Sequence, residues 1–161
     1  MFERLDTLDD LFTFRLGSLL SAEHDSLEML EDLQGAVERA DLKEVFAHHA
    51  RETREQIANV ERCFSLLGKD PDDSPSPTTR GLAKEADSLL RKSDAALRDS
   101  VAVSGGLATE HYEIATYTTL IDMAAAQGEN EVAQLLRQNL AQEEAARDTL
   151  TAMGHQLAMM R

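Results

Sequence analysis

Apolar residues recur at intervals of three and four along most of the chain, as they do on one face of an α-helix. The strict alternation of apolar and polar residues that is typical of half-buried strands is absent. The pattern therefore predicts an all-α fold. We expect helices over residues of about 5–34, 41–67, 79–100, 103–127 and 130–157.

Glycine and proline mark the ends of these helices. The three prolines lie in one stretch that follows Gly68: Pro71, Pro75 and Pro77. Gly128 separates the last two helices. The helix expected over 79–100, roughly 30 Å long at 1.5 Å per residue, can carry the chain back along the others. Two helix pairs with one long helical crossover between them form a ferritin-like four-helix bundle, which we predict as a single domain over residues 1–161.

Each of the four long helices carries a glutamate on its apolar stripe. Glu23 lies 15 residues before the first turn, near residue 38, and Glu52 lies 14 residues after it. Glu113 lies 15 residues before the second turn, near residue 128, and Glu143 lies 15 residues after it. Glu110 shares a helix face with Glu113, since the two are three residues apart. Residues equally far from a turn meet at one height in an antiparallel pair, so we predict one buried cluster of carboxylates.

Such a cluster calls for a cation, because neighbouring carboxylates in a low-dielectric interior raise one another's pKa. Carboxylate-rich sites in helical bundles suit Fe or Mn, and Mg or Ca also take oxygen ligands. We therefore predict a metal site formed by five ligands: Glu23, Glu52, Glu110, Glu113 and Glu143. Weaker candidate ligands stand near the same level: His49, Gln56, Glu144 and Asp148.

A metal-free interpretation stays open. Arg147 stands four residues after Glu143, so it could pair with that carboxylate or reach Glu110, giving a salt-bridged core. The protein would then be a helical bundle that acts as a dimerisation or partner-binding module. Its thermal midpoint would not respond to Fe, Mn or chelator.

Composition narrows the partners and the compartment. With 16 Lys and Arg against 30 Asp and Glu, the formal charge is −14, and we expect no nucleic-acid partner because the chain repels phosphate backbones. No stretch approaches the roughly 18 apolar residues of a membrane span, and the charged start Met1–Asp6 is unlike a signal peptide. The single cysteine, Cys63, lies in an apolar segment, as expected of a buried thiol in a cytoplasmic protein.

Several short runs of residues are similar to those of a known family. The most specific run is Glu110-His111-Tyr112-Glu113-Ile114-Ala115. The others are spread over nearly the whole chain: Ser21-Ala22-Glu23, His49, Glu52-Thr53, Gln56, Glu61, Phe64, Leu66-Leu67-Gly68, Tyr117, Thr119-Leu120, Gly128, Leu140, Glu143-Glu144 and Asp148. On these residues the chain resembles the YciF-like stress-response family of ferritin-like proteins.

The resemblance implies a ferritin-like bundle with a dinuclear metal centre between its helices, a homodimer, and a role in bacterial stress. The chain departs from well-known di-iron bundles, which carry Glu-x-x-His on two helices. At that spacing, Glu55 follows Glu52 and Ala146 follows Glu143. The imidazole ligands of those bundles are therefore missing.

Two further departures lie beside the predicted ligands. Gln56 stands where family members often carry His, and a neutral amide is a weaker ligand. Gly105-Gly106 is expected to loosen the helix one turn before Glu110. We therefore do not expect rapid ferroxidase chemistry, and the sequence leaves open whether the site reacts with oxygen or peroxide.

Overall fold

The computed structural model describes residues 4–72 and 74–160; residues 1–3, where the charged start begins, and residues 73 and 161 lie outside it. Within these ranges the chain forms helices and no strand, which confirms the all-α prediction. The helices are α1 (Leu8–Ala36), α2 (Ala40–Leu66), α3 (Pro77–Lys92), α4 (Ala95–Ala126) and α5 (Asn130–Met159). Of the helices in the described ranges, not one has both the length and the apolar character needed to cross a membrane.

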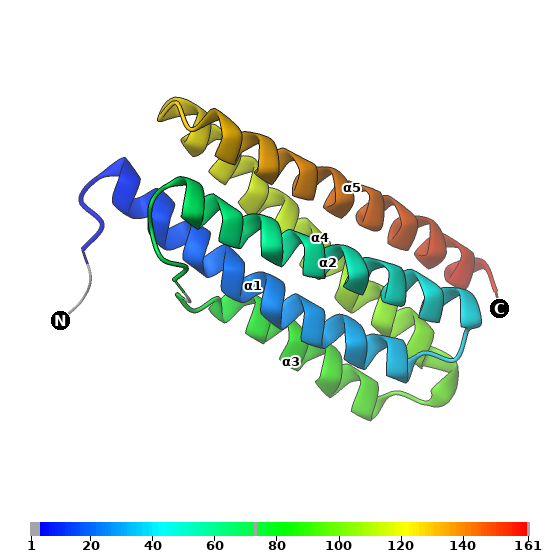
Figure 1. Ribbon diagram of the computed structural model, residues 1–161. Helices are drawn as coiled ribbons and strands as arrows, with labels where there is room; N and C mark the ends of the chain where they lie inside the picture. Colours follow the sequence, from blue (N-terminus) through cyan, green and yellow to red (C-terminus); the bar gives the residue numbers. More distant parts are fainter. Residues whose placement is uncertain (1–3, 73, 161) are drawn as a thin grey trace.

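Four long helices surround the core. Helix α1 packs against α2 and α4, and α5 packs against the same two helices, so each of the four contacts two others. The shorter α3 lies outside this group and contacts α1 and α4 (Figure 1). Figure 1 also shows that α2 and α4 run in the same direction, with α3 returning the chain between them. Helix α3 is thus the crossover that the sequence predicts.

Local signals fix several helix ends. At the start of α1, the Thr7 side chain accepts a hydrogen bond from the Asp10 N–H, and the Asp10 carboxylate accepts one from the Thr7 N–H. Gly68 and Gly128 follow α2 and α4 with φ of 67° and 79°, a left-handed conformation that favours glycine. These two glycines end helices as predicted.

The crossover is shorter than the sequence predicts. We expected helices over 79–100 and 103–127, but α3 ends at Lys92 and α4 already begins at Ala95. The break falls at Ser93 and Asp94, whose backbones are extended. Neither residue is glycine or proline, so the break carries no strong sequence signal.

The paired glycines of α4 do not loosen the helix, which corrects the expectation for Gly105-Gly106. Both lie inside a continuous helix. A Cβ at Gly106 would stand 3.1 Å from a Leu150 methyl and 3.3 Å from the Phe46 ring, and one at Gly105 would stand 3.0 Å from the Ala86 Cβ. The absence of side chains here lets neighbouring helices approach α4 closely.

The core consists of two apolar clusters with a polar layer between them. One cluster contains Phe12, Phe64, Tyr117 and Leu136, and the other contains Leu30, Phe46, Ala102 and Leu150. Buried polar residues from all four long helices lie between these clusters: Glu23, Ser26, Thr53, Gln56, Thr109, Glu110, Glu113, Thr116, Asn139 and Glu143. The fold therefore places the predicted acids at mid-length of the helices.

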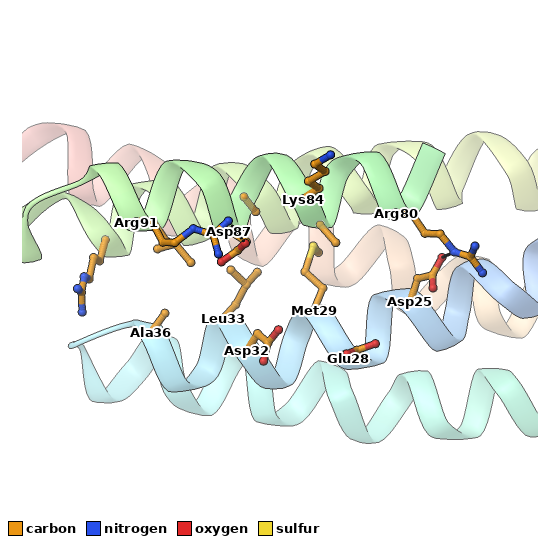
Figure 2. A pocket seen from close by; sticks show the side chains of 14 residues that line it. Asp25, Glu28, Met29, Asp32, Leu33, Ala36, Arg80, Lys84, Asp87 and Arg91 are labelled. Carbon is orange, nitrogen blue, oxygen red and sulfur yellow. Dashed lines mark ion pairs between the residues drawn. The ribbon is translucent and has the colours of Figure 1, made fainter. Parts of the chain in front are cut away.

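A surface groove of about 630 Å³ runs between α1 and α3. Asp25, Glu28 and Asp32 line its α1 side, and Arg80 and Arg91 lie on its α3 side (Figure 2). Arg80 pairs with Asp25 at 3.7 Å. The predicted ligands are not among the residues that line this groove, so it is separate from the acid cluster.

Candidate metal centre

Four of the five predicted glutamates are completely buried. Glu23 comes from α1, Glu110 and Glu113 from α4, and Glu143 from α5, and each has 0% of its surface exposed. The apolar stripes turn these side chains inward, as the spacing predicts. Burial of several acids in one layer costs free energy unless protons, hydrogen bonds or a cation compensate their charge.

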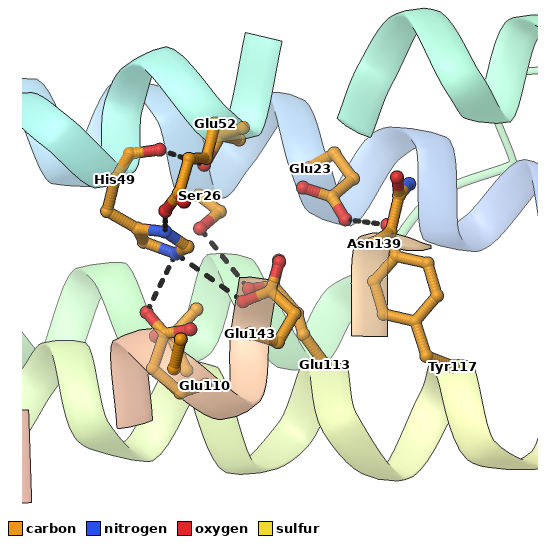
Figure 3. A network of polar contacts seen from close by, with 12 residues as sticks. Glu23, Ser26, His49, Glu52, Glu110, Glu113, Tyr117, Asn139 and Glu143 are labelled. Carbon is orange, nitrogen blue, oxygen red and sulfur yellow. Dashed lines mark hydrogen bonds and ion pairs between the residues drawn. The ribbon is translucent and has the colours of Figure 1, made fainter. Parts of the chain in front are cut away.

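His49 of α2 joins the acids at the centre of the layer. Its Nε2 lies 3.1 Å from Glu110 Oε1 and 3.4 Å from Glu143 Oε2, and its Nδ1 lies 3.2 Å from Glu52 Oε2 (Figure 3). One ligand atom each from His49, Glu110 and Glu143 falls within 4.8 Å of the others, which is close enough to hold one metal ion. A residue that the sequence favours only weakly thus occupies the middle of the site.

Glu52 lies at the edge of the cluster. Its side chain keeps 21% exposure, and its second oxygen lies 3.3 Å from Nε2 of His48, which is 63% exposed. The carboxylate therefore links a surface imidazole to the buried one of His49. Glu52 faces the core less completely than the sequence predicts.

A hydrogen-bonded network orients the acids at the other end of the layer. The Tyr117 hydroxyl donates to Glu23 Oε1 and accepts from Asn139 Nδ2 at 3.0 Å. Asn139 Nδ2 also donates to the Gln56 carbonyl at 3.1 Å, and the Ser26 hydroxyl donates to Glu113 at 3.4 Å. These bonds fix the cluster from both pairs of helices.

Sequence reasoning did not single out three members of this network as functional. Asn139 stands four residues before Glu143, and Ser26 stands three residues after Glu23, so each shares a helix face with a predicted ligand. Tyr117 stands four residues after Glu113, on the same face of its helix. Helical spacing to a predicted acid is the signal that could have identified all three.

The buried environment moves the pKa values of the cluster in opposite directions. Burial raises the pKa of Glu23, Glu110 and Glu113 well above the usual carboxyl value, and the charges of neighbouring glutamates add to this. Burial acts to lower the pKa of His49, but the surrounding carboxylates outweigh it and raise that pKa. Burial acts to raise the pKa of Glu143, but polar contacts with Glu110 and His49 hold it below the usual value. Without metal, these shifts favour a proton on His49 and the ionised form of Glu143.

The oxygens of the cluster fit a cation better than a hydrogen-bonded core. No N–H or hydroxyl group in the described ranges donates a well-aligned hydrogen bond to either oxygen of Glu110 or Glu143, or to one oxygen each of Glu23 and Glu113. Buried oxygens without donors are costly in a native protein. Several carboxylates with one imidazole are a donor set suited to Fe or Mn.

Arg147, the cation of the metal-free interpretation, does not reach the acid cluster. Arg147 pairs with Asp148 at 2.8 Å, on the surface. Among the described residues, no lysine or arginine forms an ion pair with the four buried glutamates. A salt-bridged core of Arg147 with Glu143 or Glu110 is therefore absent from this arrangement.

The weaker candidates divide between core and surface. Gln56 is completely buried, and both polar atoms of its amide are without a hydrogen-bond partner in the described ranges. Glu144 and Asp148 are exposed on the outer face of α5. Because successive helical residues are rotated by about 100°, the residue after Glu143 points away from the cluster.

The helix order and the buried carboxylate–histidine cluster define an all-helical protein with a core suited to a cation. The chain belongs to the family described as a domain of unknown function (DUF892), which matches residues 7–161. Protein YciF of Escherichia coli (strain K12) is 29% identical over 149 residues, with 91% of this chain and 90% of the relative covered. The YciF-like family predicted from the sequence is thereby confirmed.

Two solved structures share this fold closely. The crystal structure of the E. coli stress protein YciF matches with a TM-score of 0.92 at 26% identity, covering 98% of this chain and all of the other. YcfI from Rhodopseudomonas palustris matches with a TM-score of 0.90 at 33% identity, covering 94% of this chain and 98% of the other. The arrangement of the five helices is therefore common to this chain and both proteins.

Proposed function

We propose that this chain is a ferritin-like protein that binds a dinuclear metal, Fe or Mn, in its core. The predicted ligands are Glu23, Glu52, Glu110, Glu113 and Glu143, with His49 and Gln56 as further candidates. The observation that carries the proposal is that each of the four buried glutamates has an oxygen with neither a hydrogen bond nor an ion pair in the described ranges: Glu23 Oε2, Glu110 Oε2, Glu113 Oε1 and Glu143 Oε1. Two helix pairs joined by a crossover helix, with acids from all four long helices at one level, also support it.

The residues around the acids prepare the site for a cation. Tyr117 and Asn139 hold Glu23 in place, and Ser26 does the same for Glu113. The two apolar clusters exclude bulk water above and below the layer. Iron or manganese at such a site would supply one-electron chemistry with oxygen or peroxide. The chain's own part is to orient the carboxylates and to release their protons when metal binds.

Metal content is the direct test. Purified protein is loaded anaerobically with Fe(II) or Mn(II), desalted and subjected to elemental analysis, and we expect about two equivalents per chain. Glu110→Ala should lose this uptake. Glu144→Ala is the matched control, because Glu144 is an exposed glutamate beside Glu143 and its removal should leave uptake unchanged.

A thermal shift gives an independent measurement. A metal that binds only the native state at 1,000 times its Kd adds about 4 kcal/mol to the free energy of unfolding. We expect Mn(II) to raise the thermal midpoint of the wild type and of Glu144→Ala but not of Glu110→Ala. No uptake and no shift with either metal would reject the proposal and leave the metal-free interaction module.

We extend the proposal to the biological role through the relatives. Because E. coli YciF is a stress protein, a stress-response role is proposed for this chain too. Homodimer formation stays a prediction from the family resemblance, and sedimentation equilibrium of the metal-loaded protein would test it.

A further inference from the structure

A second pocket, of about 280 Å³, opens between α2 and α5 beside the acid cluster. Its floor is buried and apolar, and consists of Leu30, Phe46 and Leu150. Its mouth is bordered by Ala145 of α5, which is exposed. Alanine at this position leaves the pocket open to solvent.

The same pocket reaches the candidate metal centre. His49 and Glu52 line it, and Nε2 of the His49 ring lies 3.1 Å from Glu110 Oε1. A molecule in the pocket would therefore be separated from the buried carboxylates by one imidazole. The larger groove between α1 and α3 has no such connection, because neither His49 nor Glu52 lines it.

The lining selects an uncharged occupant. A cation would lose its hydration over the apolar floor. An anion would approach the carboxylates of Glu44 and Glu52 in a chain with a formal charge of −14, while the two imidazoles of the lining, His48 and His49, are both already paired with Glu52. Apolar cavities of roughly 150 Å³ in other proteins hold benzene. The pocket is therefore large enough for one ring, and His49 with Glu52 offers polar atoms to a hydroxyl group.

We propose that this pocket binds a small uncharged organic molecule, about the size of one aromatic ring and carrying a hydroxyl group, next to the metal centre. Binding itself rests only on the pocket. The position of this molecule next to a bound metal rests on the proposed metal-binding function. The ligand would lie on the α2–α5 side of the bundle, with its ring on the apolar floor and its hydroxyl toward Glu52.

Fluorine NMR tests binding in the metal-free protein. The probes are 4-fluorophenol, which is uncharged at neutral pH, and 4-fluorobenzoate, an anion of similar size. We expect saturable binding of the phenol and binding of the benzoate weaker by about tenfold or more. Equal binding of both probes, or no saturable binding of the phenol, would overturn the inference.

Two alanine substitutions on α5 locate the probe. Ala145→Phe places a ring at the mouth of the pocket and should weaken phenol binding by about tenfold. Ala141→Phe is the matched control, since Ala141 is also exposed but does not line the pocket. Both sites are exposed, so both variants should fold, and equal affinities in the two variants would place the probe elsewhere and reject the pocket.

Paramagnetic Mn(II) then separates this inference from the proposed function. In protein that retains Mn(II), the bound phenol should show strongly enhanced fluorine relaxation, and Glu110→Ala treated in the same way should not show it. Bound Mn(II) without phenol binding would reject the pocket and leave the metal site standing. Phenol binding without Mn(II) uptake would reject the metal site alone. If the protein retains Mn(II) and binds the phenol but the fluorine relaxation is not enhanced, the phenol does not lie next to the metal, and its proposed position is rejected.

Discussion

Tyr117 connects the apolar core to the acid cluster. It is completely buried, its ring belongs to one apolar cluster, and its hydroxyl lies between Glu23 and Asn139. Burial and the charge of Glu23 raise the pKa of Tyr117 well above its usual value, so the hydroxyl stays protonated and remains a donor. The position of Glu23 therefore depends on one phenolic hydrogen.

Replacing this hydroxyl should be costly. Tyr117→Phe leaves Glu23 without its donor, so the free energy of unfolding of the metal-free protein should fall by about 1–3 kcal/mol. Urea denaturation measures the change. Tyr112→Phe is the matched control on the same helix, because Tyr112 is only partly buried. Equal losses in the two variants would show that the hydrogen bond to Glu23 contributes nothing specific.

The direction of the acids could be predicted at this scale, but their contacts could not. The apolar stripes place Glu23, Glu110 and Glu143 in the core, as observed. The sequence predicts His49 as a weaker candidate ligand than Glu52. In the structure, however, His49 is the more buried of the two and contacts three carboxylates. Periodicity gives the angle of a side chain around its own helix, whereas contacts also depend on rotamers and on the distance between helices.

Helix α3 is held against α4 by a close approach at Gly105. The Ala86 Cβ would lie 3.0 Å from a Cβ at this position, and Ala86 is 3% exposed. From the sequence, Gly105-Gly106 predicts a loosened helix because glycine is intrinsically flexible. The sequence does not show that side chains of neighbouring helices pack against the backbone at these two positions. The break at Ser93 and Asp94 was missed for a related reason, since polar residues without glycine or proline also occur inside helices.

Substitutions of glycine on these two helices should have opposite effects. Gly81→Ala on α3 meets no atom within 4 Å and should stabilise the protein by about 0.5–1 kcal/mol. Gly105→Ala should not stabilise it, because overpacking against Ala86 costs about 1–3 kcal/mol. The double variant Gly105→Ala with Ala86→Gly should recover stability beyond additivity in a urea-denaturation cycle. If the effects of the two single substitutions on the free energy of unfolding simply add, the side chains at positions 105 and 86 are not in direct contact.

The molecule as a whole keeps a layer of acids between two apolar clusters, so its stability should depend on pH. Folding raises the pKa of three of these carboxyl groups above their ordinary value of 4.5. Each such group stabilises the native state fully at a pH below 4.5, and this contribution is lost as the pH rises through the folded-state pKa. The raised pKa of His49 acts in the same direction above its ordinary value of 6.5. The lowered pKa of Glu143 contributes a constant amount above 4.5. The metal-free protein should therefore become less stable as the pH rises.

Denaturation of the metal-free protein from about pH 5 to about pH 8 should show a decrease in the free energy of unfolding. Self-repulsion of the acidic surface acts in the same direction, so the cluster's share needs a matched pair of variants. Glu23→Gln removes a buried titrating group and should flatten the slope, whereas Glu28→Gln removes an exposed acid on the same helix and should leave it nearly unchanged. Equal slopes of stability against pH for the two variants would mean that Glu23 carries no extra proton in the native state.

Bound metal requires ionised ligands, so the stability that Mn(II) adds should increase over the same pH range.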